Sequence, residues 1–304
     1  MHAPRAGAPG APSADSRRGE DRRALRRALV ITGSFLAIEV AGGLASGSLA
    51  LLADAGHLAT DLASLALALF ALHLSERGPT AQKTFGYRRT EILAALANGT
   101  ALGAVAVFIA IEAVGRFGNP PPVKTGLMLA VAVAGLGANL VAAAALYQGR
   151  EHSLNLRAAF QHVASDALGS VGAIVAGLAI ALFGWTLADP IVALVIAGLI
   201  LISAARLVRE SVDVLMEATP SHVDVVELER AICAVPGVLS VHDLHVWTLT
   251  SGYHAMSAHV DVRAGVDAHG VLHPLSDLAL RRFAIEHTTF QLEERPPLLE
   301  IERP

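Results

Sequence analysis

Residues 50–74 read ALLADAGHLATDLASLALALFALHL, a long apolar stretch that carries two acidic side chains, Asp54 and Asp61, with His57 between them. At about 1.5 Å per residue, a helix of this length crosses a hydrocarbon core of about 30 Å. Ionisable side chains are costly at that depth, so those that occur there mark function. The stretch therefore predicts a membrane-spanning helix that carries a functional site.

Five further apolar stretches of similar character accompany this one. They lie at about 28–47, 91–115, 123–147, 160–183 and 188–208. Of the 304 residues, 53% are hydrophobic and only 16% are charged, against about 25% charged in a soluble domain. Buried core helices of a soluble protein are the alternative interpretation. Six such stretches in succession favour a six-helix domain over residues 28–210 that lies in a lipid bilayer.

The overall composition excludes several other classes of protein. A chain this apolar cannot remain disordered throughout. Its one cysteine, Cys233, excludes an intrachain disulfide framework and a zinc site made of several cysteines. The net charge of −4 provides no general basic field, so no nucleic-acid partner is expected.

Basic residues are unevenly distributed between the loops. They gather before the first span, between spans two and three, between spans four and five, and after span six, whereas the turns at 46–48 and 184–189 have no Lys or Arg. Because Lys and Arg stay on the cytoplasmic side, both termini are expected there. Residues 1–27 form a basic tail without a secretory signal, which we expect to be disordered. The Ala-, Gly- and Arg-rich character suggests a bacterial inner (plasma) membrane.

After about residue 210 the pattern changes to that of a small soluble domain. Residues 222–234 are typical of an amphipathic helix, and two alternating strands follow it. A second helix is expected over 267–284 and a third strand over TTFQLE (288–293). The fold class is therefore an α-helical membrane protein with a C-terminal cytoplasmic α+β domain over 211–295, followed by a short tail at 296–304.

A His-x-x-x-Asp pattern occurs twice at membrane depth, as His57 with Asp61 and as His162 with Asp166. Four residues advance a helix by about 400°, so each His and its Asp share one face. Two such helices side by side supply two imidazole nitrogens and two carboxylate oxygens, a set that zinc accepts in four-coordinate sites. The alternative is a pair of packed histidines hydrogen-bonded to aspartates, but the repetition of the pattern favours a metal site.

The charge of this site suggests a mechanism. With neutral histidines and ionised aspartates the empty site carries −2, which is costly in a membrane span. One divalent cation neutralises it, and so do two protons. Metal binding needs deprotonated ligands and releases protons, and an unperturbed histidine titrates near pH 6.5. Alternating occupancy by metal and protons is the core of a metal/proton exchanger.

Two other functional classes use a metal site in a membrane. A catalytic zinc enzyme or intramembrane hydrolase needs a general base beyond the ligands, and the HExxH arrangement that would supply it is absent from the sequence. A sensor binds zinc without moving it, and a passive channel moves it without protons. We therefore expect a secondary active transporter and not an enzyme, with metal ions and protons as its partners and no cofactor.

Further polar residues in the spans are candidates for a pathway or for support of the ligands. Asp54 lies three residues before His57, on the same face of the helix. Glu39, Asn98 and Asn139 are the other candidates, and interhelical hydrogen bonding is the alternative role for them.

The sequence resembles the cation diffusion facilitator family, in its zinc-transporting branch of bacterial heavy-metal efflux proteins and vesicular zinc transporters. The resemblance extends over about residues 28–293. It is carried by SLALLADAGHLATD (48–61), FGYRRTEILAALANG (85–99), NLRAAFQHVASDALGSVGAI (155–174), ADPIVAL (188–194), VHDLHVWTLTSG (241–252) and HTTFQLE (287–293).

The resemblance implies six spans, a cytoplasmic ferredoxin-like domain, a homodimer, and Zn²⁺ efflux driven by inward proton flow. It assigns the intramembrane ligands to His57, Asp61, His162 and Asp166. Since relatives with Asp in place of the first His tend towards other or more metals, His57 favours Zn²⁺, with Cd²⁺ also carried. The resemblance also implies a regulatory metal site in the cytoplasmic domain. Its expected ligands are His242, His259, Glu293 and, less directly, His287.

Overall fold

The computed structural model describes residues 33–75, 78–147 and 154–295. Both expected tails, 1–27 and 296–304, lie outside these ranges. Within the described part, residues up to Ala66 and Asn98–Ala205 form one compact unit, and Leu67–Ala97 with the residues from Arg206 onward form a second.

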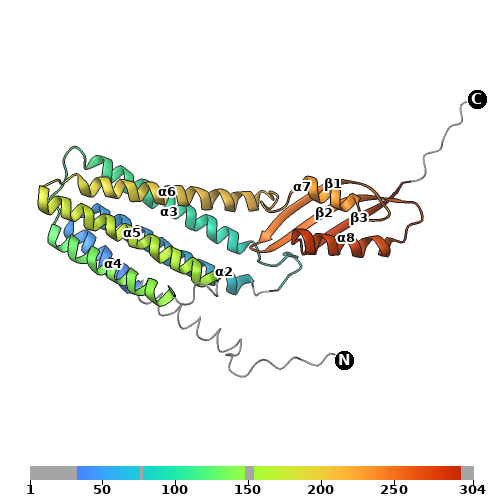
Figure 1. Ribbon diagram of the computed structural model, residues 1–304, viewed down its shortest axis with the longest axis horizontal. Helices are drawn as coiled ribbons and strands as arrows, with labels where there is room; N and C mark the ends of the chain where they lie inside the picture. The colour runs from blue at the N-terminus through green and yellow to red at the C-terminus, as the bar shows by residue number, and fades with distance from the viewer. Residues whose placement is uncertain (1–32, 76–77, 148–153, 296–304) are drawn as a thin grey trace, which may run out of the picture. The chain divides into compact units, whose positions relative to one another are not determined.

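The first part of the chain is helical, as the apolar stretches predict. A helical segment, Gly33–Ser46, is followed by the long helices drawn in Figure 1. These are α2 (Leu49–Ser75), α3 (Thr90–Gly115), α4 (Thr125–Tyr147), α5 (Leu154–Phe183) and α6 (Ala188–Leu215).

Length and hydropathy identify the membrane-spanning helices. Among the described residues, four segments are long and apolar enough to cross a membrane: Thr90–Gly115, Thr125–Ala144, Asp166–Phe183 and Ala188–Leu215. Gly33–Ser46 and Leu49–Thr60 are shorter apolar segments of the described part. Four of the six expected spans therefore reach spanning length in the described residues. The other two, expected at 28–47 and 50–74, correspond to the shorter segments, and residues 28–32 lie outside the described part.

Small side chains allow the helices to approach closely. Ala50 of α2, Ala132 of α4 and Ala173 of α5 are fully buried in one cluster of apolar residues. In contrast, large apolar side chains such as Phe108 and Leu182 are mostly exposed. This distribution is typical of membrane helices, because lipid solvates large apolar groups while small residues form the contacts between helices.

The C-terminal domain is built on a three-stranded sheet. Its strands are β1 (Val238–Thr250), β2 (Tyr253–Arg263) and β3 (His287–Arg295), in the spatial order β1-β2-β3. β1 and β2 are antiparallel, and β2 and β3 are parallel. The parallel pairing requires a crossover connection, which contains the helix α8 (Ala268–Phe283).

Two helices bury one face of this sheet, because their apolar side chains form one core with those of the strands. α7 (Val225–Cys233) starts at Asp224, whose carboxylate accepts hydrogen bonds from the next turn, and it contributes Leu228 to the core. α8 contributes Leu275, and β2 contributes Val260. The helix-strand-strand-helix-strand order expected from the sequence is confirmed.

Candidate metal sites

A histidine and an aspartate from two different helices lie close together among the apolar side chains of the first unit. His57 of α2 and Asp166 of α5 approach until Nε2 of the imidazole is 3.6 Å from Oδ1 of the carboxylate. The Asp166 side chain is 6% exposed and that of His57 is 26% exposed. Two donors of one tetrahedral Zn²⁺, each about 2.0–2.1 Å from the metal, lie roughly 3.4 Å apart. The observed spacing therefore suits two ligands of one metal ion.

The other two expected ligands belong to the same helices. Asp61 lies one turn after His57 on α2, and His162 lies one turn before Asp166 on α5. Their side chains are outside the described part of the structure. The structure thus brings together one member of each His-x-x-x-Asp pattern, and the positions of Asp61 and His162 in the site stay a prediction.

A second buried polar group lies one turn away from this pair. Asp54 of α2 is 3% exposed and accepts a hydrogen bond from Ser170 Oγ of α5 at 3.4 Å. Glu39 is fully buried within hydrogen-bonding reach of Asp54, and neither of its oxygens accepts a hydrogen bond from the described residues. Two adjacent buried carboxyls need a proton or a cation to be tolerated.

The remaining pathway candidates occupy other helices of the same domain. Asn98 is buried in α3, and Asn139 is half-buried in α4. Both face the helix bundle at least in part, which is compatible with either a pathway or an interhelical hydrogen-bonding role.

Asp189 is a buried carboxylate that is not among the site residues predicted from the sequence. It lies in the first turn of α6, and its oxygens accept hydrogen bonds from the backbone of Leu49 at 2.8 Å and Ala50 at 3.1 Å, and from Ser48 Oγ at 2.5 Å. The side chain therefore satisfies the free N–H groups at the start of α2. Its signal in the sequence is an acidic residue beside a long apolar stretch.

Arg116 connects α3 to the same group. Its Nη1 donates to the carbonyl of Gly47 at 2.7 Å and lies 3.7 Å from Asp189 Oδ2. Gly47 has φ of 75°, a conformation that glycine adopts without strain. This end of α2, which carries His57 further along, is thus held by hydrogen bonds and by a buried ion pair.

Three of the four expected cytoplasmic ligands gather on the sheet face opposite α7 and α8. Ligand atoms of His242, His259 and Glu293 all lie within 4.8 Å of one another. His259 Nδ1 is 2.8 Å from Glu293 Oε1, and His242 Nε2 is 3.7 Å from Glu293 Oε2. Two imidazoles and a carboxylate are a usual partial ligand set for zinc.

The strand register explains this cluster. His242 of β1 is paired with His259 of β2, and Asp261 of β2 is paired with Glu293 of β3. His259 and Asp261 alternate with core residues such as Val260, so they point away from the helices. An irregularity between His242 and His245 interrupts the pairing of β1 and β2 beside the cluster.

The structure does not bring His287 to this cluster. His287 begins β3 and is paired with Ala255, whereas Glu293 is near the other end of the strand. Its ring lies edge-on to Phe85, with centroids 5.5 Å apart. Six residues of strand extend about 20 Å, so His287 cannot share a metal ion with Glu293 in this conformation.

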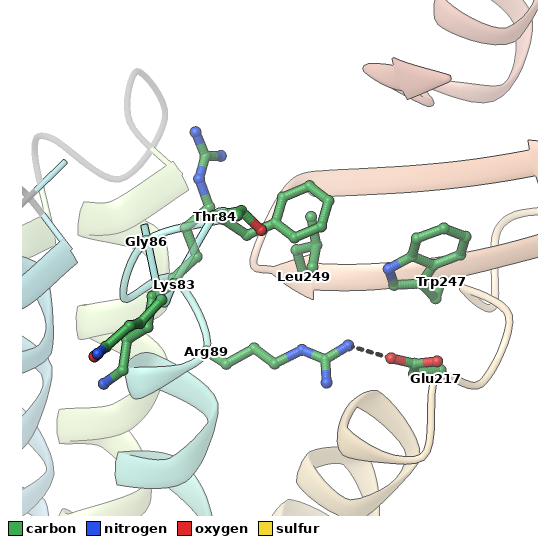
Figure 2. A pocket seen from close by; sticks show the side chains of 10 residues that line it. Lys83, Thr84, Gly86, Arg89, Glu217, Trp247 and Leu249 are labelled. Carbon is green, nitrogen blue, oxygen red and sulfur yellow. Dashed lines mark hydrogen bonds and ion pairs between the residues drawn. The ribbon is translucent and has the colours of Figure 1, made fainter. Parts of the chain in front are cut away.

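The second unit also contains a pocket of about 380 Å³, shown in Figure 2. Arg89, just before α3, reaches across it to Glu217, and the two groups are 2.7 Å apart. Trp247 and Leu249 of β1 form part of its wall. Glu217 is the one acidic residue among those that line the pocket, and it is already paired. The pocket therefore does not offer a ligand set for a metal ion.

A pair of histidines lies elsewhere in the C-terminal domain. The rings of His222 and His254 have centroids 4.7 Å apart, and His254 Nδ1 is 3.1 Å from Thr248 Oγ1. Burial lowers the pKa of His254, the neighbouring His222 lowers it further, and Glu286 opposes the shift. Protonation of His254 is therefore less favourable in the folded domain than for a histidine in water.

Comparisons with known proteins agree with both parts of this description. Residues 25–216 match the family of cation efflux transmembrane domains, and residues 220–295 match the cytoplasmic domain of cation efflux proteins. The chain is 45% identical over 276 residues to the zinc transporter ZitB of Escherichia coli (strain K12), covering 90% of this chain and 88% of that protein.

Two other relatives have similar coverage. The cadmium, cobalt and zinc/H⁺-K⁺ antiporter of Bacillus subtilis is 41% identical over 280 residues, covering 90% of each chain. The metal cation efflux system protein CzcD of Cupriavidus metallidurans is 42% identical over 279 residues, covering 91% of this chain and 88% of CzcD. A solved structure, the metal-bound C-terminal domain of that CzcD transporter, is 43% identical and covers 23% of this chain and 99% of its own, with a TM-score of 0.23.

Proposed function

Because this chain belongs to the cation efflux family, we propose that it exports divalent metal ions, chiefly Zn²⁺ and with it Cd²⁺, from the cytoplasm in exchange for protons. The chain is a multi-pass membrane transporter and not an enzyme. The observation that carries the choice of site is the approach of His57 and Asp166 to 3.6 Å from two different helices. The relatives named as zinc transporters and antiporters support the choice of cargo.

The proposed transport site consists of His57, Asp61, His162 and Asp166. Each helix contributes one imidazole and one carboxylate, so the metal ion joins α2 and α5. Two carboxylates balance the charge of one divalent cation, and two imidazole nitrogens favour zinc over ions that prefer oxygen. The burial of Asp166 also lowers the amount of water around a bound ion, which makes the attraction between charges stronger than at a surface.

Proton exchange follows from the same four groups. When the metal ion leaves, two carboxylates in an apolar environment are uncompensated unless protons replace it. Since metal binding requires deprotonated ligands, each new ion displaces the protons. Glu39 and Asp54 lie beside the site and are the groups best placed to pass cations or protons to it. Asn98 and Asn139 complete the proposed pathway.

The cytoplasmic cluster of His242, His259 and Glu293 is proposed as a regulatory metal site. It is separate from the transport site in sequence and in its set of ligands. Three protein ligands leave at least one coordination position of the metal ion for water or for a group of a second subunit. We propose a homodimer in which metal binding at this cluster favours one arrangement of the subunits. The transporter is proposed to occupy a bacterial inner membrane with both termini in the cytoplasm, as its basic loops indicate.

Flux measurements in proteoliposomes test this function. The purified protein is reconstituted, a pH gradient is imposed, and accumulation of Zn²⁺, Cd²⁺ and Mn²⁺ is followed together with the internal pH. We expect Zn²⁺ and Cd²⁺ to move in the direction opposite to the protons. The internal pH should change as the metal accumulates. Equal metal flux with and without the gradient would indicate a channel, and metal binding without flux would indicate a sensor.

A further inference from the structure

Gly169 of α5 lies one turn after Asp166. At this point α5 meets Asp54, which lies one turn before His57 on α2. A Cβ atom at position 169 would be 2.4 Å from Asp54 Oδ1 and 2.9 Å from Asp54 Cγ. Real Cβ atoms essentially never lie within 3.0 Å of such an atom, so the observed approach of Asp54 to α5 requires glycine at this position.

Asp54 has little freedom to move away from a larger residue. It is 3% exposed, and its Oδ2 accepts the hydrogen bond from Ser170. The buried carboxyl of Glu39 lies within hydrogen-bonding reach of Asp54 and further limits its movement. Interiors packed in this way transmit a steric change to the neighbouring elements. A side chain at position 169 would therefore press on α2 through Asp54.

The contact between Asp54 and Gly169 is one helical turn from the contact between His57 and Asp166. The same two helices form both contacts, so the separation of α2 and α5 at the first contact sets the separation of the ligands at the second. Metal–ligand distances differ between ions, and Cd²⁺ is larger than Zn²⁺. A change in helix separation therefore alters the preference between these ions more than it alters the ability to bind either.

We propose that Gly169 is a positioning residue that determines metal specificity, because it lets Asp54 seat α2 close to α5 and so holds the ligands at the spacing that Zn²⁺ requires. The proposal rests on the transport site proposed above. On this proposal, Gly169→Ala moves α2 and α5 apart. All four ligand side chains keep their identity.

The experiment measures the relative affinity for Zn²⁺ and Cd²⁺. Full-length protein carrying His242→Ala and His259→Ala is used throughout, so that the cytoplasmic cluster does not contribute. Competition between the two metals is followed by equilibrium binding to the purified protein. In this background Gly169→Ala is expected to shift the ratio of dissociation constants several-fold in favour of Cd²⁺.

Gly172→Ala is the matched control. Gly172 lies one turn further along α5, and a Cβ atom there would be 3.1 Å from Val192 Cγ1 of α6. It adds the same methyl group to the same helix but presses on α6 instead of α2. The ratio of Zn²⁺ to Cd²⁺ affinities is expected to stay at the value of the parent protein.

A double-mutant cycle with Asp54→Ala separates helix displacement from general damage. Without the carboxylate, an alanine at 169 has room, so Gly169→Ala is expected to change neither the metal ratio nor the folding of the Asp54→Ala protein. If Gly169→Ala alone does not fold, Asp54→Ala is expected to restore folding, and failure to restore it overturns the proposal.

Two further outcomes decide between the proposals. An unchanged metal ratio in Gly169→Ala, or the same shift with and without Asp54, would overturn the role of Gly169 and leave the transport site standing. Intramembrane binding that survives Asp166→Ala would overturn the transport site itself.

Discussion

The two candidate metal sites differ in what surrounds their ligands. Asp166 is 6% exposed between helices packed through small residues, whereas His242 of the cytoplasmic cluster is 49% exposed on an open sheet face. Water can replace a missing ligand at the sheet surface but not between the helices, where an uncompensated charge is costly. The same chemical groups are therefore expected to be indispensable at the first site and adjustable at the second.

The largest effect is expected from removing a carboxylate of the buried site. Asp61→Ala or Asp166→Ala should reduce Zn²⁺ uptake into inverted membrane vesicles to the background, because the three remaining ligands cannot neutralise the ion. Glu112→Gln is the control, since Glu112 is an exposed carboxylate of the same membrane domain that pairs with Arg116. Transport at the parental rate by a purified Asp166 variant would remove the distinction between the two sites.

A buried carboxylate that serves structure should affect stability first. Asp189→Ala leaves the buried N–H groups of Leu49 and Ala50 without their acceptor and removes one of the two carboxylates beside Arg116, the other being Glu112. We expect it to lower the free energy of unfolding by about 3 kcal/mol or more. Denaturation of the purified protein in detergent measures this. Ser211→Ala removes one hydrogen bond within α6 and should cost about 1 kcal/mol. Similar losses for both variants would contradict the proposed role of Asp189.

The identity of a ligand in the buried site should decide selectivity. His57→Asp replaces a nitrogen ligand by a carboxylate, which makes the site harder and more negative and so more suitable for ions that prefer oxygen. We expect the discrimination against Mn²⁺ to relax in competition uptake assays, while the variant still carries metal. A Zn²⁺/Mn²⁺ preference equal to that of the parent would argue against His57 as a ligand.

Loss of the exposed cluster should adjust transport without stopping it. His242→Ala combined with His259→Ala is expected to lower the apparent zinc affinity or the rate several-fold, with proton coupling intact, because the intramembrane ligands remain complete. Flux and internal pH measured together in proteoliposomes test both statements. His287→Ala is a useful control, since His287 lies at the other end of β3. Complete loss of transport in a well-folded double variant would show that this site is as essential as the buried one.

The smallest expected effect is on the pH dependence of stability, and it comes from His254, which is not a proposed metal ligand. The pKa of His254 is lowered on folding, so the unfolded chain binds this proton more readily. Its neutral form supports the fold above about pH 6.5, the ordinary value for histidine, and stability is lost as the pH falls below it. Hydrogen exchange of residues 253–263 in the full-length protein, corrected for intrinsic rates, should show less acid sensitivity in His254→Gln. Identical pH profiles would contradict this assignment.

Much of the architecture follows from local patterns. Long apolar stretches predict the helices α2 to α6, and alternation with flanking turns predicts the αββαβ domain, because hydropathy and periodicity depend on residues near one another in sequence. The repeated His-x-x-x-Asp pattern likewise identifies α2 and α5 as the helices that carry the ligands, and the structure places His57 next to Asp166.

What the sequence alone determined is thus which segments form helices and strands and which of their faces carry ionisable groups. Only the tertiary structure decided which groups meet. It placed Asp54 against Gly169, used Asp189 to cap a helix more than a hundred residues away in the chain, and separated His287 from Glu293. The physical reason is that such contacts depend on how helices cross and how strands are registered. Those arrangements result from packing over the whole domain, which no local pattern of residues specifies.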